Sequence, residues 1–297
     1  CHTYSQGESY FSGTQNLEID LIKICAEDIF EAEAGNYDGY VASGGTEANI
    51  QAQWVYRNYF QKEKGAKPEE IGLLFSADAH YSANKGCNLL GIKQVGVKVD
   101  EKRRWDLNDL EVQLLNAKKQ GIKYLIVHLS MGTTMFGSVD NPDDILPVVK
   151  QHFPDYFAHI DAAFGGFIYP FTAKETTLNL NNKDIHSVTI DGHKMLQAPY
   201  GTGIFICKKG LIEYAQTEEA SYVQGTDFTL CGSRSGANAV SVWMILMTHG
   251  YEGWKYLMEK LVDRTDRICD ALDNMNIRYY RHPAMNIVTI KATDINE

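Results

Sequence analysis

The sequence predicts an α/β fold in which a mostly parallel sheet carries helices on both faces. Three observations support this prediction. Short apolar runs alternate with longer amphipathic runs, as is typical of βαβ units. Hydrophobic residues make up 44% of the 297 residues, which is enough for a large core. Polar and glycine-rich stretches follow several of the apolar runs, where such sheets bind their ligands.

Each expected element follows from the length and periodicity of its run. Four short apolar runs predict buried strands, at residues 124–130, 158–163, 187–190 and 202–207. Four longer amphipathic runs predict helices, at residues 46–62, 81–90, 107–119 and 145–152. From Gly236 onward the pattern turns helical, over residues 237–248 and 253–275, and a last strand is expected at residues 286–292.

The last expected strand has no partner elements after it, which indicates a second domain cut short. We therefore expect an N-terminal segment at residues 1–14, a large domain at residues 15–250 and the start of a small C-terminal domain at residues 251–297. The chain begins with Cys1 rather than methionine, so we expect an incomplete N-terminus.

The composition argues against several classes of protein. A net charge of -10 disfavours nucleic-acid binding, which requires clustered lysine and arginine. No apolar run approaches the roughly 20 residues of a membrane span. The six cysteines are scattered without a C-x-x-C pair, which indicates neither a disulfide framework nor a zinc site. Free thiols are typical of a reducing compartment, so we expect a cytoplasmic protein without a metal centre.

The first candidate ligand-binding motif is the stretch SGGTEAN at residues 43–49, which opens an expected helix. Its two glycines allow close approach of the backbone to a ligand, and the helix N-terminus offers N–H donors to an anion. The stretch lacks the lysine of a Walker A loop and the spacing of a dinucleotide fingerprint. It predicts a phosphate cradle, although taken alone it is more often an ordinary capped helix start.

Two further motifs directly follow expected strands. Asp161 begins the stretch DAAFGG, in which small residues leave room for a flat ligand, although such an aspartate can simply cap a helix. Lys194 lies in the stretch DGHKM and is a candidate Schiff-base amine, although most lysines are surface residues. Pyridoxal phosphate requires an amine, an acid at its pyridine nitrogen and a phosphate cradle. The three motifs together therefore predict a pyridoxal-phosphate site.

With these motifs the sequence resembles the group II pyridoxal-phosphate-dependent amino-acid decarboxylases, in particular the bacterial histidine decarboxylase and archaeal tyrosine/aspartate decarboxylase branches. The resemblance runs from Gly44 to about Trp243, and its motifs keep the family order: SGGTEAN, AHYS at residues 79–82, GTT at residues 132–134, DAAFGG, HKM and GSRSG at residues 232–236. It implies the aspartate-aminotransferase-like fold type I, with a seven-stranded, mostly parallel sheet. It also implies a homodimer with the active site at the subunit interface.

The resemblance assigns roles around the cofactor ring. Lys194 would form the Schiff base, and Asp161 would keep a proton on the pyridine nitrogen. His80 would stack on the ring face that Ala163 does not cover. Thr134 would lie near Asp161 and the carboxylate of the substrate.

Other residues are assigned to the phosphate and to proton transfer. Gly45 and Thr46 would bind the phosphate, and Ser233 would reach it across the dimer interface. His193 would contact the phosphate or the substrate and is a candidate proton donor. Tyr222 lies where family members carry a tyrosine that protonates the substrate carbon, although it could equally be a plain loop tyrosine.

Asp191 departs from part of the family, because some members carry Asn or Ser beside the phosphate. A carboxylate there repels a phosphate dianion unless it points elsewhere. Other branches do carry Asp, including lyases that cleave phosphorylated sphingoid bases.

The predicted function is conversion of an L-amino acid to its amine and carbon dioxide. The candidate substrates are histidine, serine, tyrosine, aspartate and glutamate. Two alternatives remain: a pyridoxal-phosphate-dependent carbon–carbon lyase acting on a phosphorylated amino alcohol, and a catalytically inactive decarboxylase-like scaffold.

Overall fold

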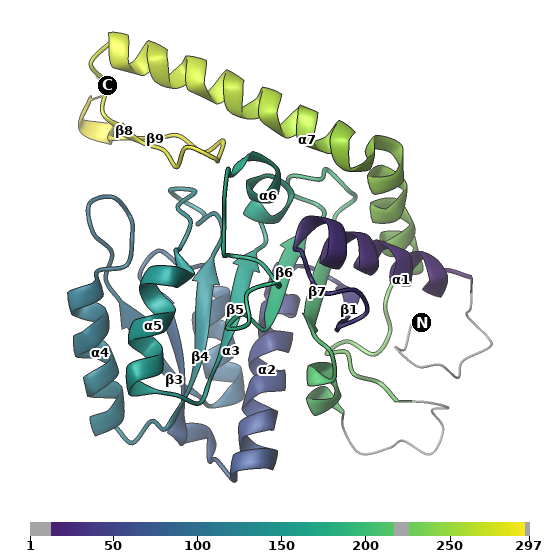
Figure 1. Ribbon diagram of the computed structural model, residues 1–297, viewed down its shortest axis with the longest axis vertical. Coiled ribbons are helices and arrows are strands. Elements are labelled where there is room, and N and C mark those ends of the chain that lie inside the picture. The colour runs from purple at the N-terminus through teal and green to yellow at the C-terminus, as the bar shows by residue number, and fades with distance from the viewer. Residues whose placement is uncertain (1–12, 217–225, 295–297) are drawn as a thin grey trace.

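A seven-stranded sheet forms the centre of the computed structural model, which describes residues 13–216 and 226–294 (Figure 1). In spatial order its strands are β1 (Tyr37–Ala42), β7 (Gly203–Lys208), β6 (Ser187–Asp191), β5 (Tyr156–Ala162), β4 (Tyr124–Ser130), β2 (Ile71–Ser76) and β3 (Lys93–Val97). Only β7 runs antiparallel to its neighbours. The predicted fold class, a mostly parallel seven-stranded sheet, is confirmed.

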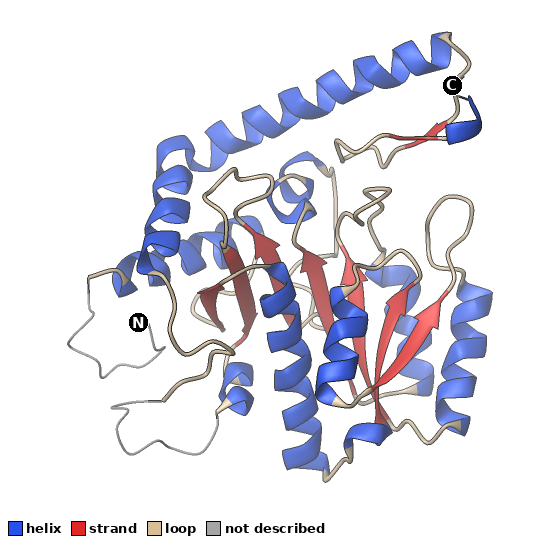
Figure 2. Ribbon diagram, turned by 180° about the vertical axis from the view of Figure 1, so that it is seen from behind, coloured by secondary structure: helices blue, strands red, loops and turns tan. Residues whose placement is uncertain are grey.

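Helices cover both faces of this sheet (Figures 1 and 2). On one face, α2 (Gly45–Lys64) and α3 (Ser82–Leu90) enclose one apolar core. The other face has a second core, enclosed by α1 (Gln15–Lys23), α4 (Leu107–Lys119), α5 (Pro142–His152), α6 (Tyr169–Thr172) and α7 (Gly236–Asn274). No helix among residues 13–216 and 226–294 is long and apolar enough to cross a membrane.

Local capping sets the helix boundaries. The α4 helix begins where predicted because the Asp106 carboxylate accepts hydrogen bonds from the N–H groups of Asn108 and Asp109. The α5 helix begins at Pro142, three residues before the expected start, because Asn141 caps it by accepting from the N–H of Asp143.

The C-terminal region differs from the expectation in one respect. The α7 helix is interrupted at Gly250 (φ 61°, ψ 176°), between the two expected helices. The strand expected at residues 286–292 is present but shorter than predicted, because only β9 (Thr289–Ile290) forms, paired with β8 (Tyr279–Tyr280). The side chains of Met285 and Ile287 instead pack against Gly132 and Gly137, so this segment follows the 132–137 loop and does not extend a sheet.

The topology brings the predicted motifs to one edge of the sheet. The parallel strands β5 and β6 end at Ala162 and Asp191, and β1 ends at Ala42, one residue before the glycine pair. The antiparallel strand β7 begins beside that end of β1, with Gly203 paired to Ala42. A Cβ at Gly203 would lie 2.5 Å from the carbonyl carbon of Gly44, so only glycine permits this close approach.

Candidate active site

Lys194 lies in the turn after β6, beside a buried carboxylate. Its Nζ is 2.9 Å from Oδ2 of Asp191, and Nε2 of His193 is 3.7 Å from the same oxygen. Burial raises the pKa of Asp191, and the charge of Lys194 opposes this rise. Oδ1 of Asp191 is buried without a hydrogen-bond partner in the described structure. The Asp191 carboxylate therefore faces Lys194.

The glycine-rich loop contacts this lysine turn directly. A Cβ at Gly45 would lie 2.8 Å from Oδ2 of Asp191 and 3.1 Å from Cβ of Ala163, so the site leaves no room for a side chain there. The buried Glu47 fixes the loop, because it accepts hydrogen bonds from the N–H and the hydroxyl of Ser43. The start of α2, with Gly45, thus lies against Asp191, and the N–H groups of a helix start are able to bind an anion, as the predicted phosphate cradle requires.

Asp161, the acid predicted to face the pyridine nitrogen, lies at the end of β5 and is 8% exposed. Its Oδ2 accepts a hydrogen bond from Nδ2 of Asn49 at 2.8 Å and lies 3.4 Å from Nε2 of His128. Its Oδ1 accepts from the N–H of Ala163 at 3.1 Å. Burial acts to raise the pKa of Asp161, but His128 and the Ala163 N–H outweigh it and hold that pKa below its usual range. The carboxylate is therefore ionised and able to hold a proton on a pyridinium nitrogen.

His80 belongs to the same centre, in the turn between β2 and α3. Its Nδ1 is 2.9 Å from Oγ of Ser82, and its ring lies 4.2 Å from the ring of Tyr81. Burial lowers the pKa of His80, while the Asp161 and Lys194 charges act on it in opposite directions. An uncharged imidazole at this position is able to stack on an aromatic ring.

The structure does not bring every predicted residue together. Thr134 is exposed in the 132–138 loop, and the groups that donate hydrogen bonds to the Asp161 carboxylate among the described residues belong to Asn49 and Ala163 instead. Ser233 is exposed. Tyr222 lies outside the described residues. The roles of Thr134, Ser233 and Tyr222 therefore stay predictions.

Sequence reasoning gave no role to Arg234, although it lies in the GSRSG motif. Its guanidinium pairs with the buried carboxylate of Glu18 and donates to the carbonyl of Val41 at 2.9 Å. It also lies 5.0 Å from the ring centroid of Tyr40. Arg234 therefore fastens α1 and the segment before α7 to the end of β1, from which the phosphate cradle starts.

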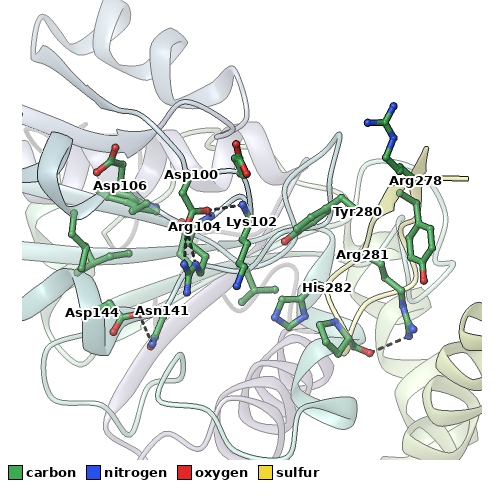
Figure 3. Close-up of a pocket in the computed structure, with 18 of the residues that line it drawn as sticks. Asp100, Lys102, Arg104, Asp106, Asn141, Asp144, Arg278, Tyr280, Arg281 and His282 are labelled. Atoms are coloured by element: carbon green, nitrogen blue, oxygen red, sulfur yellow. Dashed lines mark hydrogen bonds and ion pairs between the residues drawn. The ribbon is translucent and has the colours of Figure 1, made fainter. Parts of the chain in front are cut away.

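A groove of about 1500 Å³ in the described structure is lined by residues outside this centre (Figure 3). It separates the segment before α4 from the C-terminal hairpin, and none of its lining residues is a predicted site residue. Arginines along it pair with carboxylates of the protein itself, as in the contacts of Arg104 with Asp100 and of Arg278 with Asp294. The clustered chemistry around Lys194 marks the site better than the size of this groove.

Comparison with known proteins decides the family. The model of the pyridoxal-dependent decarboxylase conserved domain matches residues 16–280. This chain belongs to the pyridoxal-dependent decarboxylase family. The decarboxylase is 50% identical over 298 residues to a tryptophan decarboxylase of Clostridium sporogenes, a match that covers 100% of this chain and 72% of that protein. It is 32% identical to an L-aspartate/L-glutamate decarboxylase of Pyrococcus horikoshii, covering 96% and 72% of the two chains.

Solved structures agree on the fold of the decarboxylase. An L-methionine decarboxylase from Streptomyces sp. 590 superposes with a TM-score of 0.79 at 18% identity, over 96% of this chain and 75% of that one. A sphingosine-1-phosphate lyase of Burkholderia pseudomallei gives 0.78 at 18% identity, over 91% of this chain. The chain spans 63% of that lyase, and identity this low shows the fold alone.

The decarboxylase is thus a pyridoxal-phosphate-dependent carboxy-lyase that acts on an amino acid. The residues present suit this cofactor. An amine at Lys194, an ionised acid at Asp161 and a helix start that tolerates only glycine at position 45 lie around one edge of the sheet.

Proposed function

We propose that this decarboxylase acts on aromatic L-amino acids, with tryptophan as the foremost substrate. The observation that carries the proposal is the 50% identity to a tryptophan decarboxylase over the whole chain. Two exposed tyrosines support it. Tyr81 packs on His80, and Tyr200, which is 91% exposed, packs on His193 at 4.8 Å. Aromatic surfaces beside the reacting centre suit an indole or phenol ring. Tryptophan was not among the substrates expected from the sequence.

The arrangement supports a separate role for each residue around the cofactor. Pyridoxal phosphate, when bound, supplies an electron sink for the pair released as carbon dioxide departs. The Lys194 amine would hold the cofactor and give way to the substrate amine. Asp161 would hold a proton on the pyridine nitrogen, and His80 and Ala163 would lie against the two faces of the ring. The N–H groups and hydroxyl at Gly45 and Thr46 would bind the phosphate, and Ser233 would reach it from the second subunit.

His193 is a candidate to return a proton to the substrate carbon. The N–H of Thr202 donates to its Nδ1 at 3.3 Å, so in the neutral ring the proton is on Nε2. That nitrogen faces the Lys194 side of the site, 3.7 Å from Asp191. Tyr222 is the other candidate donor, and Thr134 is assigned to the carboxylate of the substrate. Asp191 would contribute to the site by its ion pair with the Lys194 amine.

The remaining proposals concern assembly and location. A homodimer with the active site at the subunit interface follows from the family resemblance. Cys25, Cys87 and Cys207 are free and buried, which suits a reducing cytoplasm. The break in α7 at Gly250 supports a boundary between a large domain at residues 15–250 and the start of a small domain at residues 251–297.

An assay of the twenty amino acids for released carbon dioxide tests the substrate. The purified protein with pyridoxal phosphate is expected to show its highest kcat/KM with tryptophan, and to lose turnover in Lys194→Ala. Borohydride reduction followed by peptide mapping should place the cofactor on Lys194. A higher kcat/KM with aspartate or glutamate would contradict the aromatic assignment. Aldehyde release from a phosphorylated amino alcohol would favour the lyase alternative, and no turnover at all would favour the scaffold.

A further inference from the structure

A layer of buried polar side chains lies on the sheet face beneath α2. The register pairs His128 with His159 and His159 with Ser187, so these side chains share one face. His128 and Ser187 are fully buried, and His159 is 1% exposed. Polar groups this deep are costly unless they find hydrogen-bond partners. The layer also includes Asp161, the acid of the site, two residues after His159 on the same strand.

Asn49, in the second turn of α2, bonds to two members of this layer, Asp161 and His159, and to Ser82 at the start of α3. It is 1% exposed. Its Nδ2 donates to Oδ2 of Asp161 at 2.8 Å and to Oγ of Ser82 at 3.0 Å. Its Oδ1 lies 2.9 Å from Nε2 of His159. The opposite amide orientation would set a carbonyl oxygen against the Asp161 carboxylate, so the assignment of nitrogen and oxygen is fixed by chemistry.

This orientation determines the tautomer of His159. Because Oδ1 of Asn49 accepts only, Nε2 of His159 must carry the proton. Nδ1 then accepts from the hydroxyl of Ser187 at 2.7 Å, and Ser187 accepts from the hydroxyl of Tyr56. Burial, together with the charge of His128, lowers the pKa of His159 to about 3, in keeping with a neutral ring. The hydrogen bonds from Tyr56 through Ser187 and His159 to Asn49 therefore all donate in the same direction.

A second path of hydrogen bonds leads from Asn49 through Ser82 to His80, the histidine proposed to stack on the cofactor ring. Since Oγ of Ser82 accepts from Asn49, its hydroxyl proton is free to donate to Nδ1 of His80 at 2.9 Å. The backbone N–H of Ser82 also points at that nitrogen, at 3.3 Å. With two donors at Nδ1, the neutral His80 ring carries its proton on Nε2.

We propose that Asn49 is a positioning residue of the active site. Its amide holds the Asp161 carboxylate and, through Ser82, fixes the orientation and tautomer of His80. The positions of the Asp161 carboxylate and of the His80 imidazole then both depend on Asn49. Both positions should change when Asn49 is replaced. This inference rests on the roles proposed above for Asp161 and His80.

The test compares three substitutions, each of which replaces a polar side chain with an apolar side chain of similar size. Asn49→Leu removes the hydrogen bonds of Asn49 to Asp161, Ser82 and His159. Ser82→Ala removes only the hydrogen bonds of the Ser82 hydroxyl, to Asn49 and His80. Gln53→Met is the matched control, because Gln53 is a buried amide one turn further along α2 whose side-chain atoms have no hydrogen-bond partner in the described structure. Two measurements are made on each. The His80 tautomer is read in the apoprotein by NMR of ¹⁵N-labelled histidine, with His80→Gln to assign the signal, and the dissociation constant of pyridoxal phosphate is measured by equilibrium binding.

In the wild type we expect a His80 signal of the Nε2–H form. Asn49→Leu should weaken that preference, because the Ser82 hydroxyl is no longer held as a donor to His80, and it should raise the dissociation constant of pyridoxal phosphate about tenfold or more, because Asp161 loses a charge-assisted hydrogen bond. Ser82→Ala leaves the backbone N–H at position 82 as the remaining donor to Nδ1 of His80, so it should weaken the preference for the Nε2–H form without abolishing it, and it should change the dissociation constant by less than about threefold. Gln53→Met should change neither.

Two outcomes would overturn the inference. One is a folded Asn49→Leu protein that keeps both the wild-type His80 signal and the wild-type affinity. If Asn49→Leu does not fold, an unchanged His80 tautomer in Ser82→Ala overturns it instead. The tautomer is read without cofactor or substrate, so a protein that fails to decarboxylate aromatic amino acids would count against the proposed function alone.

Discussion

Replacing Arg234 with methionine should destabilise the protein far more than an ordinary surface substitution. The guanidinium and the Glu18 carboxylate are both nearly excluded from water, with side-chain exposures of 5% and 7%. Glu18 also accepts the N–H of Val41 at 2.7 Å, so it stays in place after Arg234 is removed. Removing one partner of a buried ion pair typically costs about 3–5 kcal/mol, because the other charge is left buried and unpaired. That loss compares with a total stability of about 5–15 kcal/mol for a typical protein.

Urea unfolding followed by tryptophan fluorescence measures this loss. The double variant Glu18→Gln with Arg234→Met removes both charges, so it should recover most of the lost free energy of unfolding. A single variant within about 1 kcal/mol of the wild type would refute the reasoning, since it would place Arg234 among surface ion pairs. Because β1 leads into the phosphate cradle, Arg234→Met should also weaken the binding of pyridoxal phosphate.

Three further predictions concern the carboxylates and the cradle. Asp191→Asn should tighten pyridoxal phosphate binding several-fold in equilibrium titrations, because it removes a negative charge beside the cradle; weaker binding would show that the Lys194 ion pair matters more. Gly45→Ala should weaken binding about tenfold or more without loss of fold, since its Cβ would lie 2.8 Å from Oδ2 of Asp191; unchanged affinity would refute the tight cradle. Burial raises the pKa of Asp140 to about 7, although the Ser130 N–H opposes this, so its contribution to stability is lost as the pH rises through about 7. Asp140→Asn should therefore raise the urea midpoint at about pH 8 and leave it almost unchanged at about pH 4; equal shifts at both would contradict the assignment.

The edge of the sheet where the site forms could be predicted from the sequence because parallel strands end on one side. Asp161 lies at the end of one recognisable strand and Lys194 follows another, so the topology rule was enough to bring them to one edge. The break between the two expected C-terminal helices likewise coincides with the φ of 61° at Gly250. In both cases the prediction rests on residues that are close together in the sequence, so it does not depend on knowing the tertiary contacts.

Other features depend on pairings that no local pattern records. Arg234 meets Glu18 only because α1 packs against α7 across the end of β1. His128 and His159 lie within otherwise apolar strands, and their position on the Asp161 face becomes visible only from the strand register. A weak signal was available for Asn49, since asparagine is a poor helix former in a helix interior and its presence there suggests another role. The restriction of the expected 286–292 strand to the two residues of β9 could not be predicted, because the packing of Ile287 on the 132–137 loop overrides the strand propensity of this segment.

The order of strands has a consequence for how the protein is made. In the described sheet β1 has one neighbour, β7, which leaves the ribosome long after it. Until residue 208 has been synthesised, the nascent β1 is an unpaired edge with the glycine loop attached, a state prone to wrong association. The glycine loop that follows β1 can therefore take its final position only after β7 has been made. The ability to capture pyridoxal phosphate would then report that synthesis has passed β7.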